Sequence, residues 1–466
     1  MSRTRGLAAL GLLFIVLAYV IPAPATITPQ GWRQTAIFIC VIAGMVTDPL
    51  PASALVLVGL TAMAANGTPM REVLGGYAEP SVWLVLVAML IAKMMLDCGL
   101  ARRIALLFVR AFGKTSLGVA YALQMTDVTL ASGVPSITAR SAGMVLPIAR
   151  SIAELFQSRP DETRHRLGAY LIAAVYQGSA VACAMFITGQ ASNLLGASLA
   201  LKLTGVQVTA PSWFMAAIVP GLLSCIVVPW ITYRVLTPEI THTPEAPAFA
   251  RSELLKMGRL SRDESITLLV FVTVGLMWLT TVFHGIDVTL VALVGLAVLL
   301  ATGTMSWQSA SSERSAWDVF IWYGGMLRMG ELLNATGSTR VLAENVASLF
   351  VGIPWIVVLI AILIIFFYSH YFFASITAHM LAMFPPFVAV LIGIGVPKLL
   401  AVYSLMCLAN LTAGLTHYGT TTGPILFGTG YVTRAEWWRV GFFVSVANMV
   451  IWLTAGFAWW KFLGFW

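Results

Sequence analysis

Long apolar runs recur from one end of the chain to the other, and they constrain the fold more than any other feature. They lie at 7–23, 33–50, 53–65, 81–101, 166–202 and 213–236, and again at 265–284, 287–303, 317–335, 398–428 and 437–463. Such runs match the thickness of a bilayer, in which only helices and closed barrels satisfy their own backbone groups. Barrel strands would alternate in polarity at every second residue, and these runs do not. The sequence therefore predicts an all-α, polytopic membrane protein.

Charge is scarce and is placed in the connections between the runs. Only 10% of the residues are charged and 59% are apolar, whereas a soluble domain carries roughly a quarter charged residues. The net charge of +8 comes from Lys and Arg in short connections, as the positive-inside rule predicts, so no nucleic-acid partner is expected. The five cysteines lie singly in apolar runs, and we interpret them as packing residues.

The first thirty residues combine Arg3 and Arg5 with an apolar run and the segment Ala23-Pro24-Ala25. This pattern fits either an uncleaved first span or a secretory signal peptide. We favour the span, because the apolar run continues without a polar cleavage region.

Internal repetition divides the rest of the chain into two copies. The tetrapeptide LVGL occurs at 57–60 and 293–296, part of 99–105 matches 337–343, and SITA occurs at 136–139 and 375–378. The offsets are 236, 238 and 239 residues. One such match is expected by chance in an apolar chain, but three in the same order indicate a duplication.

A polar segment separates the two copies. Residues 237–263 contain three prolines and four basic residues, which is typical of a cytoplasmic linker. The predicted organisation is a first span at 1–30, a first repeat at 31–236, this linker, and a second repeat at 264–466.

Two further apolar regions, 116–156 and 355–394, do not fit a simple count of spans. Basic clusters stand before and after the first region, at 102–114 and 159–166, and both favour the cytoplasm. Both clusters can face the cytoplasm only if 116–156 enters and leaves the membrane on the same side, as a re-entrant hairpin does.

The repeat then predicts a second hairpin at 355–394. Five true spans in each repeat invert the second copy, so this hairpin enters from the outer side and the C-terminus lies outside. About eleven spans result, and transporters with inverted repeats place the substrate near the bilayer midplane, where the hairpin tips meet.

The two predicted tips carry the best candidate residues for binding a substrate. Ser136 and Thr138 lie in the first tip, and Ser375 and Thr377 lie at the repeat-related positions. A helix that begins at membrane depth exposes N–H donors, and with hydroxyls beside them it can bind a carboxylate. Alternatively, these hydroxyls only cap the helices or bond back to them.

A basic or titratable residue follows each tip threonine by two positions, namely Arg140 and His379. A cation at membrane depth is costly unless it is paired, so Arg140 indicates an anionic ligand or a water-filled cavity. The alternatives for Arg140 are a side chain that extends to the membrane interface and an ion pair with a carboxylate such as Asp127. The alternative for His379 is a hydrogen-bonded core position.

Two small, polar stretches interrupt the apolar sequence after the hairpins, at 188–193 and 419–424. Unwound elements of this kind offer backbone dipoles and side-chain groups to a ligand, although small residues also allow close helix packing. The candidates here are Ser192, Asn193, Thr420, Thr421 and Thr422, with His417 and Tyr418 beside them. Lys93 with Asp97, and Arg328 with Glu331, are interpreted as structural pairs.

Three runs resemble the divalent anion/sodium symporter family, in its citrate, tartrate and plastid-type dicarboxylate branch: PSITARSAGMVLPI (135–148), SHYFFASITAHMLAMFP (369–385) and LTHYGTTTGPILFGTGYV (415–432). The resemblance extends over nearly the whole chain. It implies an eleven-span homodimer in the plasma membrane that moves small organic anions by an elevator-like movement.

The resemblance also implies Ser-Asn-Thr motifs at both tips, which bind carboxylate and help to build sodium sites. Here the motifs read Ser136-Ile137-Thr138 and Ser375-Ile376-Thr377. Isoleucine cannot replace an amide that coordinates a cation or a carboxylate, so sodium coupling is not expected, and neither is a metal or cofactor.

Arg140 and His379 would then supply the positive charge, and an empty carrier with such charges would resist crossing the membrane. The resulting prediction is sodium-independent exchange of di- or tricarboxylates, with sodium- or proton-coupled symport as the alternative. Neither HExxH nor paired catalytic carboxylates occur, so no enzyme is predicted. Membrane lipid is the other expected partner.

Overall fold

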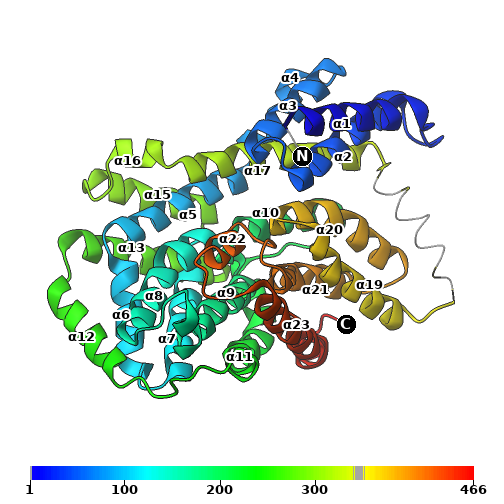
Figure 1. Cartoon of the computed structure of the whole chain (residues 1–466). Coiled ribbons are helices and arrows are strands. Elements are labelled where there is room, and N and C mark those ends of the chain that lie inside the picture. The colour runs from blue at the N-terminus through cyan, green and yellow to red at the C-terminus, as the bar shows by residue number, and fades with distance from the viewer. Residues whose placement is uncertain (1–2, 339–340, 342–349, 351) are drawn as a thin grey trace.

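The computed structural model describes residues 3–338, 341, 350 and 352–466, and these residues are almost entirely helical (Figure 1). Within them there is no strand, only an isolated bridge between Thr115 and His242. Residues 339, 340, 342 and 343 of the 337–343 repeat match lie outside the described residues. The predicted all-α class is confirmed.

The first half of the chain contains these elements: α1 (Arg3–Ile15), η1 (Val16–Val20), α2 (Pro29–Thr47), α3 (Ala52–Ala65), α4 (Met70–Val73), η2 (Gly75–Ala78), α5 (Pro80–Asp97), α6 (Leu100–Phe112), α7 (Ser116–Ala131), η3 (Thr138–Val145), α8 (Leu146–Leu155), η4 (Glu162–Arg166), α9 (Gly168–Met185), η5 (Ile187–Gly189), α10 (Ala191–Thr204) and α11 (Ala210–Val235).

The linker and the second half contain these elements: α12 (Glu245–Met257), α13 (Arg262–Leu279), α14 (Thr281–His284), α15 (Val288–Ala301), α16 (Trp307–Ser312), α17 (Arg314–Ala335), α19 (Trp355–Ser369), η7 (His370–Phe372), α20 (Ile376–Gly393), α21 (Lys398–Leu411), η8 (Thr412–Leu415), α22 (Thr422–Phe427), α23 (Arg434–Ile451), η9 (Trp452–Gly456) and α24 (Phe457–Phe462).

Local sequence explains where several of the long helices begin. Thr209, Ser261 and Thr433 form capping boxes at the starts of α11, α13 and α23, each with the residue three positions on. Such reciprocal bonds satisfy N–H donors that a helix leaves free at its first turn. Helix α9 is apolar on all sides, and every one of its residues is buried, so it forms the centre of the protein.

Seven of the described helical segments are long and apolar enough to cross a membrane: Pro80–Asp97, Gly168–Met185, Ala210–Val235, Trp355–Phe372, Ile376–Gly393, Lys398–Leu415 and Arg434–Phe462. Shorter apolar helices lie at Thr4–Val20, Ala52–Ala65 and Val288–Ala301. The count differs from the predicted eleven partly because α13 and α17 carry several charged residues. Two of the seven segments are the arms of the predicted second hairpin.

Helices from the two predicted repeats pack on one another reciprocally. Helix α3 packs on α17, and its counterpart α15 packs on α5; likewise α2 contacts α17, and α13 contacts α5. In Figure 1, α1 to α5 and α15 to α17 lie together along the upper side, whereas α6 to α9, α11 and α19 to α23 lie below. Reciprocal contacts of this kind are also expected of two related halves, and the division of the chain into repeats stays a prediction.

The linker binds both ends of the first predicted hairpin. Thr243 donates its backbone N–H to the carbonyl of Lys114 at 2.9 Å, and Ser116 donates to the carbonyl of Thr241 at 3.1 Å. Glu239 donates to the carbonyl of His165 at 3.0 Å. The segments before and after 116–156 therefore lie beside the same stretch of the linker, and the re-entrant hairpin stays a prediction.

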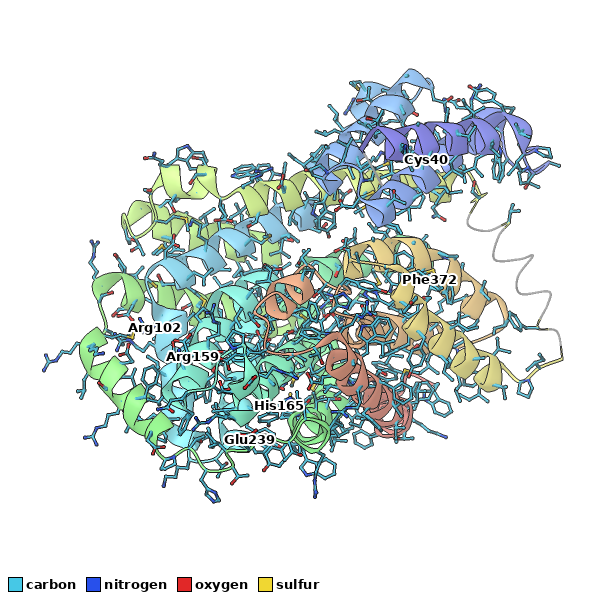
Figure 2. All side chains as sticks on the ribbon, in the orientation of Figure 1. Cys40, Arg102, Arg159, His165, Glu239 and Phe372 are labelled. Carbon is cyan, nitrogen blue, oxygen red and sulfur yellow. The ribbon has the colours of Figure 1, made fainter. Side chains whose placement is uncertain are left out.

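Residues of the basic segments and of the linker lie away from Cys40 and Phe372. Figure 2 shows Arg102 and Arg159 on the left of the view and His165 and Glu239 near its lower centre. At the base of the second hairpin, the rings of Trp355 and the C-terminal Trp466 lie 5.9 Å apart. The C-terminus thus lies beside the first residue of α19, and the inverted arrangement stays a prediction.

Candidate functional site

The chain between η8 and α22 contacts the first predicted tip and η7, the short helix just before the second predicted tip. On one side, the Thr138 hydroxyl lies 2.7 Å from the Thr421 hydroxyl and 3.2 Å from that of Thr422. On the other side, the His370 Nε2 bonds the carbonyl of Gly419 at 2.7 Å, and the Tyr418 hydroxyl donates to the carbonyl of Tyr371 at 3.1 Å. The two hairpins and the second polar stretch therefore converge on one site.

The first tip is built by a break between α7 and η3. Residues Ser132–Ser136 are not helical, and Ser136 then accepts a hydrogen bond from the N–H of Ala139 at 3.2 Å. The serine thus caps the second arm of hairpin 1, which is the structural alternative for this hydroxyl. Thr138 is half-buried and faces Thr421, whose side chain is exposed.

The second tip repeats this local structure. Ser375 is the N-cap of α20 and accepts a hydrogen bond from the N–H of Ala378 at 3.4 Å. The two serines are 239 residues apart, and so are the two alanines whose N–H groups donate to them. Thr377 lies in the first turn of α20 and is half-buried, while Ile137 and Ile376 are buried.

Arg140 faces the protein interior and not the site between the tips. Its side chain is 0% exposed, and its Nε donates to Asp127 Oδ1 at 2.8 Å. Nη1 donates to the carbonyls of Val134 at 2.5 Å and Gly189 at 2.6 Å, and Nη2 bonds Cys183 Sγ at 3.1 Å. The expectation of a free cation for the anion is corrected: four of the five guanidinium N–H donors already have protein partners.

His379 takes the equivalent structural position in hairpin 2. Its Nε2 bonds the carbonyl of Phe366 at 2.9 Å and the Ser369 hydroxyl at 3.1 Å, and the side chain is fully buried. Its ring lies 4.5 Å from that of Phe366 and 4.9 Å from that of His370. These contacts do not support direct binding of a substrate by His379. They match the alternative of a buried, hydrogen-bonded histidine.

The first polar stretch supports the back of tip 1. The Thr188 hydroxyl donates to the carbonyl of Ser132 at 2.8 Å. Asn193 donates its amide to the carbonyls of Cys183 and Phe186, both at 3.0 Å, and so caps the end of α9. Ser192 is buried beside it. Residues 188–193 therefore support tip 1 from behind, whereas Thr421 and Thr422 contact the Thr138 hydroxyl of this tip directly.

The second stretch has its own internal order. Thr420 accepts a hydrogen bond from the N–H of Gly423 at 3.0 Å, which caps the start of α22. Trp438 Nε1 donates to His417 Nδ1 at 3.3 Å. Consequently, Thr138, Thr421 and Thr422 are the predicted residues that the structure brings together by direct bonds.

Several supporting residues were not among the candidates, although Gln190 lies within the predicted stretch 188–193. Gln190 donates to Asn410 at 2.6 Å, Gln177 to the carbonyl of Gly414 at 2.8 Å, and Tyr176 to that of Ala413 at 2.8 Å. His370 belongs to the same group. Polar side chains inside apolar runs were the available signal, because such residues are costly at membrane depth without a role.

The two predicted structural pairs are confirmed. Lys93 lies 2.9 Å from Asp97, and Arg328 lies 2.7 Å from Glu331.

Comparison with known proteins identifies the family. The family described as the sodium:sulfate symporter transmembrane region matches residues 4–466. The chloroplastic dicarboxylate transporter 1 of Arabidopsis thaliana is 38% identical over 97% of this chain and 82% of its own length. The citrate/succinate antiporter of Escherichia coli (strain K12) is 32% identical over 98% of this chain and 97% of its own length.

Solved structures agree on the fold. The YdaH transporter of Alcanivorax borkumensis superposes with a TM-score of 0.55 at 14% identity, over 92% of this chain and 98% of that one.

A polytopic helical protein whose broken helices meet at one polar site belongs to the class of secondary transporters. Within that class, this chain belongs to the sodium:sulfate symporter family, so the predicted membership in the divalent anion/sodium symporters is confirmed. It is a transporter and not an enzyme. Its bacterial relative and its apolar helices also bear out a multi-pass protein of the plasma membrane.

Proposed function

We propose that this transporter exchanges small di- or tricarboxylates, such as succinate, malate, 2-oxoglutarate, citrate or tartrate, across the plasma membrane. The observation that carries the proposal is that Thr138 of the first tip, and His370 and Tyr371 just before the second tip, all contact residues 418–422. Relatives named as a dicarboxylate transporter and a citrate/succinate antiporter support the substrate class and the exchange.

The chemistry at the convergence suits a carboxylate. Thr138, Thr421 and Thr422 present hydroxyls, each of which can donate one hydrogen bond and accept others. The arms that begin at Ser136 and Ser375 direct N–H groups and the positive ends of helix dipoles toward the tips. Both carboxylates of a small dianion can thus accept hydrogen bonds from these hydroxyl and N–H groups, without direct contact with the Arg140 guanidinium.

Burial of the tip isoleucines supports sodium-independent transport. Ile137 is 8% exposed and Ile376 is 4% exposed, so both side chains pack inside the protein. An aliphatic side chain offers no oxygen to a sodium ion. Symport with sodium or protons is the alternative, and it is an outcome of the experiment below.

The elevator movement and the homodimer complete the proposal. Helices α1 to α5 and α15 to α17 would form the fixed part, and the two hairpins with α9 and α21 would form the moving part (Figure 1). Ser198 on α10 lies 3.2 Å from the Tyr323 hydroxyl on α17, at a boundary that such a movement would shift.

Counterflow in proteoliposomes tests the exchange. Vesicles preloaded with malate are expected to take up labelled succinate or malate, at the same rate when sodium is replaced by potassium. Vesicles without an internal anion are expected to take up little. Equal uptake into empty vesicles, or a requirement for sodium, would overturn the exchange proposal in favour of symport.

Removal of one tip hydroxyl tests the site. Thr138→Val keeps the shape of the side chain but removes its bonds to Thr421 and Thr422, and losing about 1–3 kcal/mol of hydrogen bonding predicts a roughly 5- to 150-fold loss of uptake. Thr61→Val is the control, because Thr61 bonds the carbonyl of Leu57 in its own helix. Wild-type uptake by the Thr138→Val variant would remove Thr138 from the site.

A further inference from the structure

Two cavities flank the second arm of hairpin 1. A cavity of about 320 Å³ lies between this arm and helices α6 and α12, and Gly143, Pro147 and Ser151 form its wall on the hairpin. A second cavity of about 330 Å³ is lined by Ala142, Leu146, Pro147, Arg150, Ser151 and Glu154. Because the two share Pro147 and Ser151, we describe them together as the α8 groove.

The α8 groove runs along the arm that begins at the substrate site. Residues four apart lie on one face of an α-helix, as Leu146, Arg150 and Glu154 do in α8. Thr138 and Ala142 precede them in η3, the π-helical start of the same arm. Thr138 is the hydroxyl that contacts Thr421. The far end of the arm leads into 159–166, the basic segment predicted to face the cytoplasm.

Arg150 is the weakly paired cation of this groove. Its closest carboxylate oxygen, on Glu154, is 3.8 Å from Nη2, and the two side chains are 51% and 57% exposed. The other lining cation, Arg102, is held by Glu253 at 2.6 Å. A hydrogen bond from Lys256 and the charges of Lys256 and Arg102 lower the pKa of Glu253, which pairs with both cations.

We propose that the α8 groove is the cytoplasmic entry path for the anion, and that Arg150 is a positioning residue that attracts the anion toward Thr138. The proposal rests on the proposed function, since it assumes an anionic substrate. A cationic side chain in a cleft raises the local concentration of anions. Glu154, one turn further from the tip, partly cancels this attraction.

A labelling experiment tests the groove without using transport. Ala142→Cys is made in a Cys40→Ser, Cys98→Ser background, because these two native cysteines are partly exposed while Cys183, Cys225 and Cys407 are buried. Anionic and cationic thiol reagents are added from the cytoplasmic side. Arg150→Gln is expected to lower the ratio of the anionic to the cationic labelling rate by about 3- to 10-fold.

The matched control is Arg314→Gln. Arg314 is also exposed and is also paired weakly with a carboxylate four residues on, Asp318 at 3.7 Å, but it lies on α17 outside the groove. It should leave the labelling ratio unchanged. A thiol at 142 that does not react from the cytoplasmic side, or a ratio that Arg150→Gln does not alter, overturns the proposal.

Sided transport provides the second measurement. In vesicles of known orientation, Arg150→Gln should raise KM at the cytoplasmic face by about 3- to 10-fold and leave kcat and the KM at the outer face unchanged, while Glu154→Gln should lower the cytoplasmic KM. Equal changes at both faces would contradict an entry path. Absence of dicarboxylate exchange in the wild type counts against the proposed function. The labelling ratio still tests whether Arg150 attracts anions into the α8 groove.

Discussion

The two hairpins hold their arms together at equivalent positions but with different chemistry. In hairpin 1, Arg140 reaches back thirteen residues to the carboxylate of Asp127, and in hairpin 2, His379 reaches back thirteen residues to the backbone carbonyl of Phe366. Both pairs are related by the offset of 239 residues that relates the tip serines. Both hairpins therefore join their two arms at this position, but one does so with an ion pair and the other with a neutral hydrogen bond.

The difference has an energetic consequence. Hairpin 1 depends on a charge pair that is useful only when both members are present, because a single buried charge is costly. Hairpin 2 depends on neutral hydrogen bonds and on the rings of Phe366 and Phe373 around His379. Hairpin 1 should therefore be far more sensitive to substitution at this position than hairpin 2.

The largest expected effect comes from breaking the charged pair. Arg140→Leu leaves Asp127 buried without its partner, and a loss of about 3–5 kcal/mol of stability is expected. Thermal unfolding of the purified protein in detergent measures the loss. The double variant with Asp127→Leu should recover part of it, since the isolated charge is gone; a stable single variant that fails only in transport would instead return Arg140 to the substrate site.

A smaller effect is expected at the equivalent position of hairpin 2. His379→Leu removes the bonds to Phe366 and Ser369 but leaves no buried charge, so a loss of about 1–3 kcal/mol is expected in the same unfolding assay. His379→Gln, which can still donate, should lose less. A loss as large as that of Arg140→Leu would remove the contrast between the hairpins.

The smallest effect should be the same in both hairpins. Ser136→Ala and Ser375→Ala each remove one helix cap, at a cost of about 1 kcal/mol. Similar melting shifts for the two variants would support equivalent tips. Clearly unequal shifts would mean that the matching SITA segments no longer perform the same structural role.

The sequence predicted the tips because serine and threonine at a fixed offset survive duplication as a visible pattern. It could not decide the partner of Arg140, since Asp127 and an anion are equally suitable partners for a guanidinium until the backbone is placed. The contact of Thr138 with Thr421 joins residues 283 positions apart, and no local pattern encodes it.

The helix α6 was missed for a different reason. It is a thirteen-residue helix with Arg102, Arg103 and Arg110, so it lacks the length and the uniform apolar character of a span. In the sequence its charges marked only a cytoplasmic cluster. Its apolar side, with Leu100, Leu106 and Val109, becomes informative once α7 and α12 are seen to pack on it.

The bonds between residues 239–243 and the base of hairpin 1 also bear on synthesis of the chain. Gly113, Lys114 and Ser116 find their partners in Thr241 and Thr243, more than one hundred residues later. A ribosome must therefore complete the whole first repeat before the entrance to its hairpin can close. The first half of this transporter becomes a finished unit only when the connection to the second half has already been made.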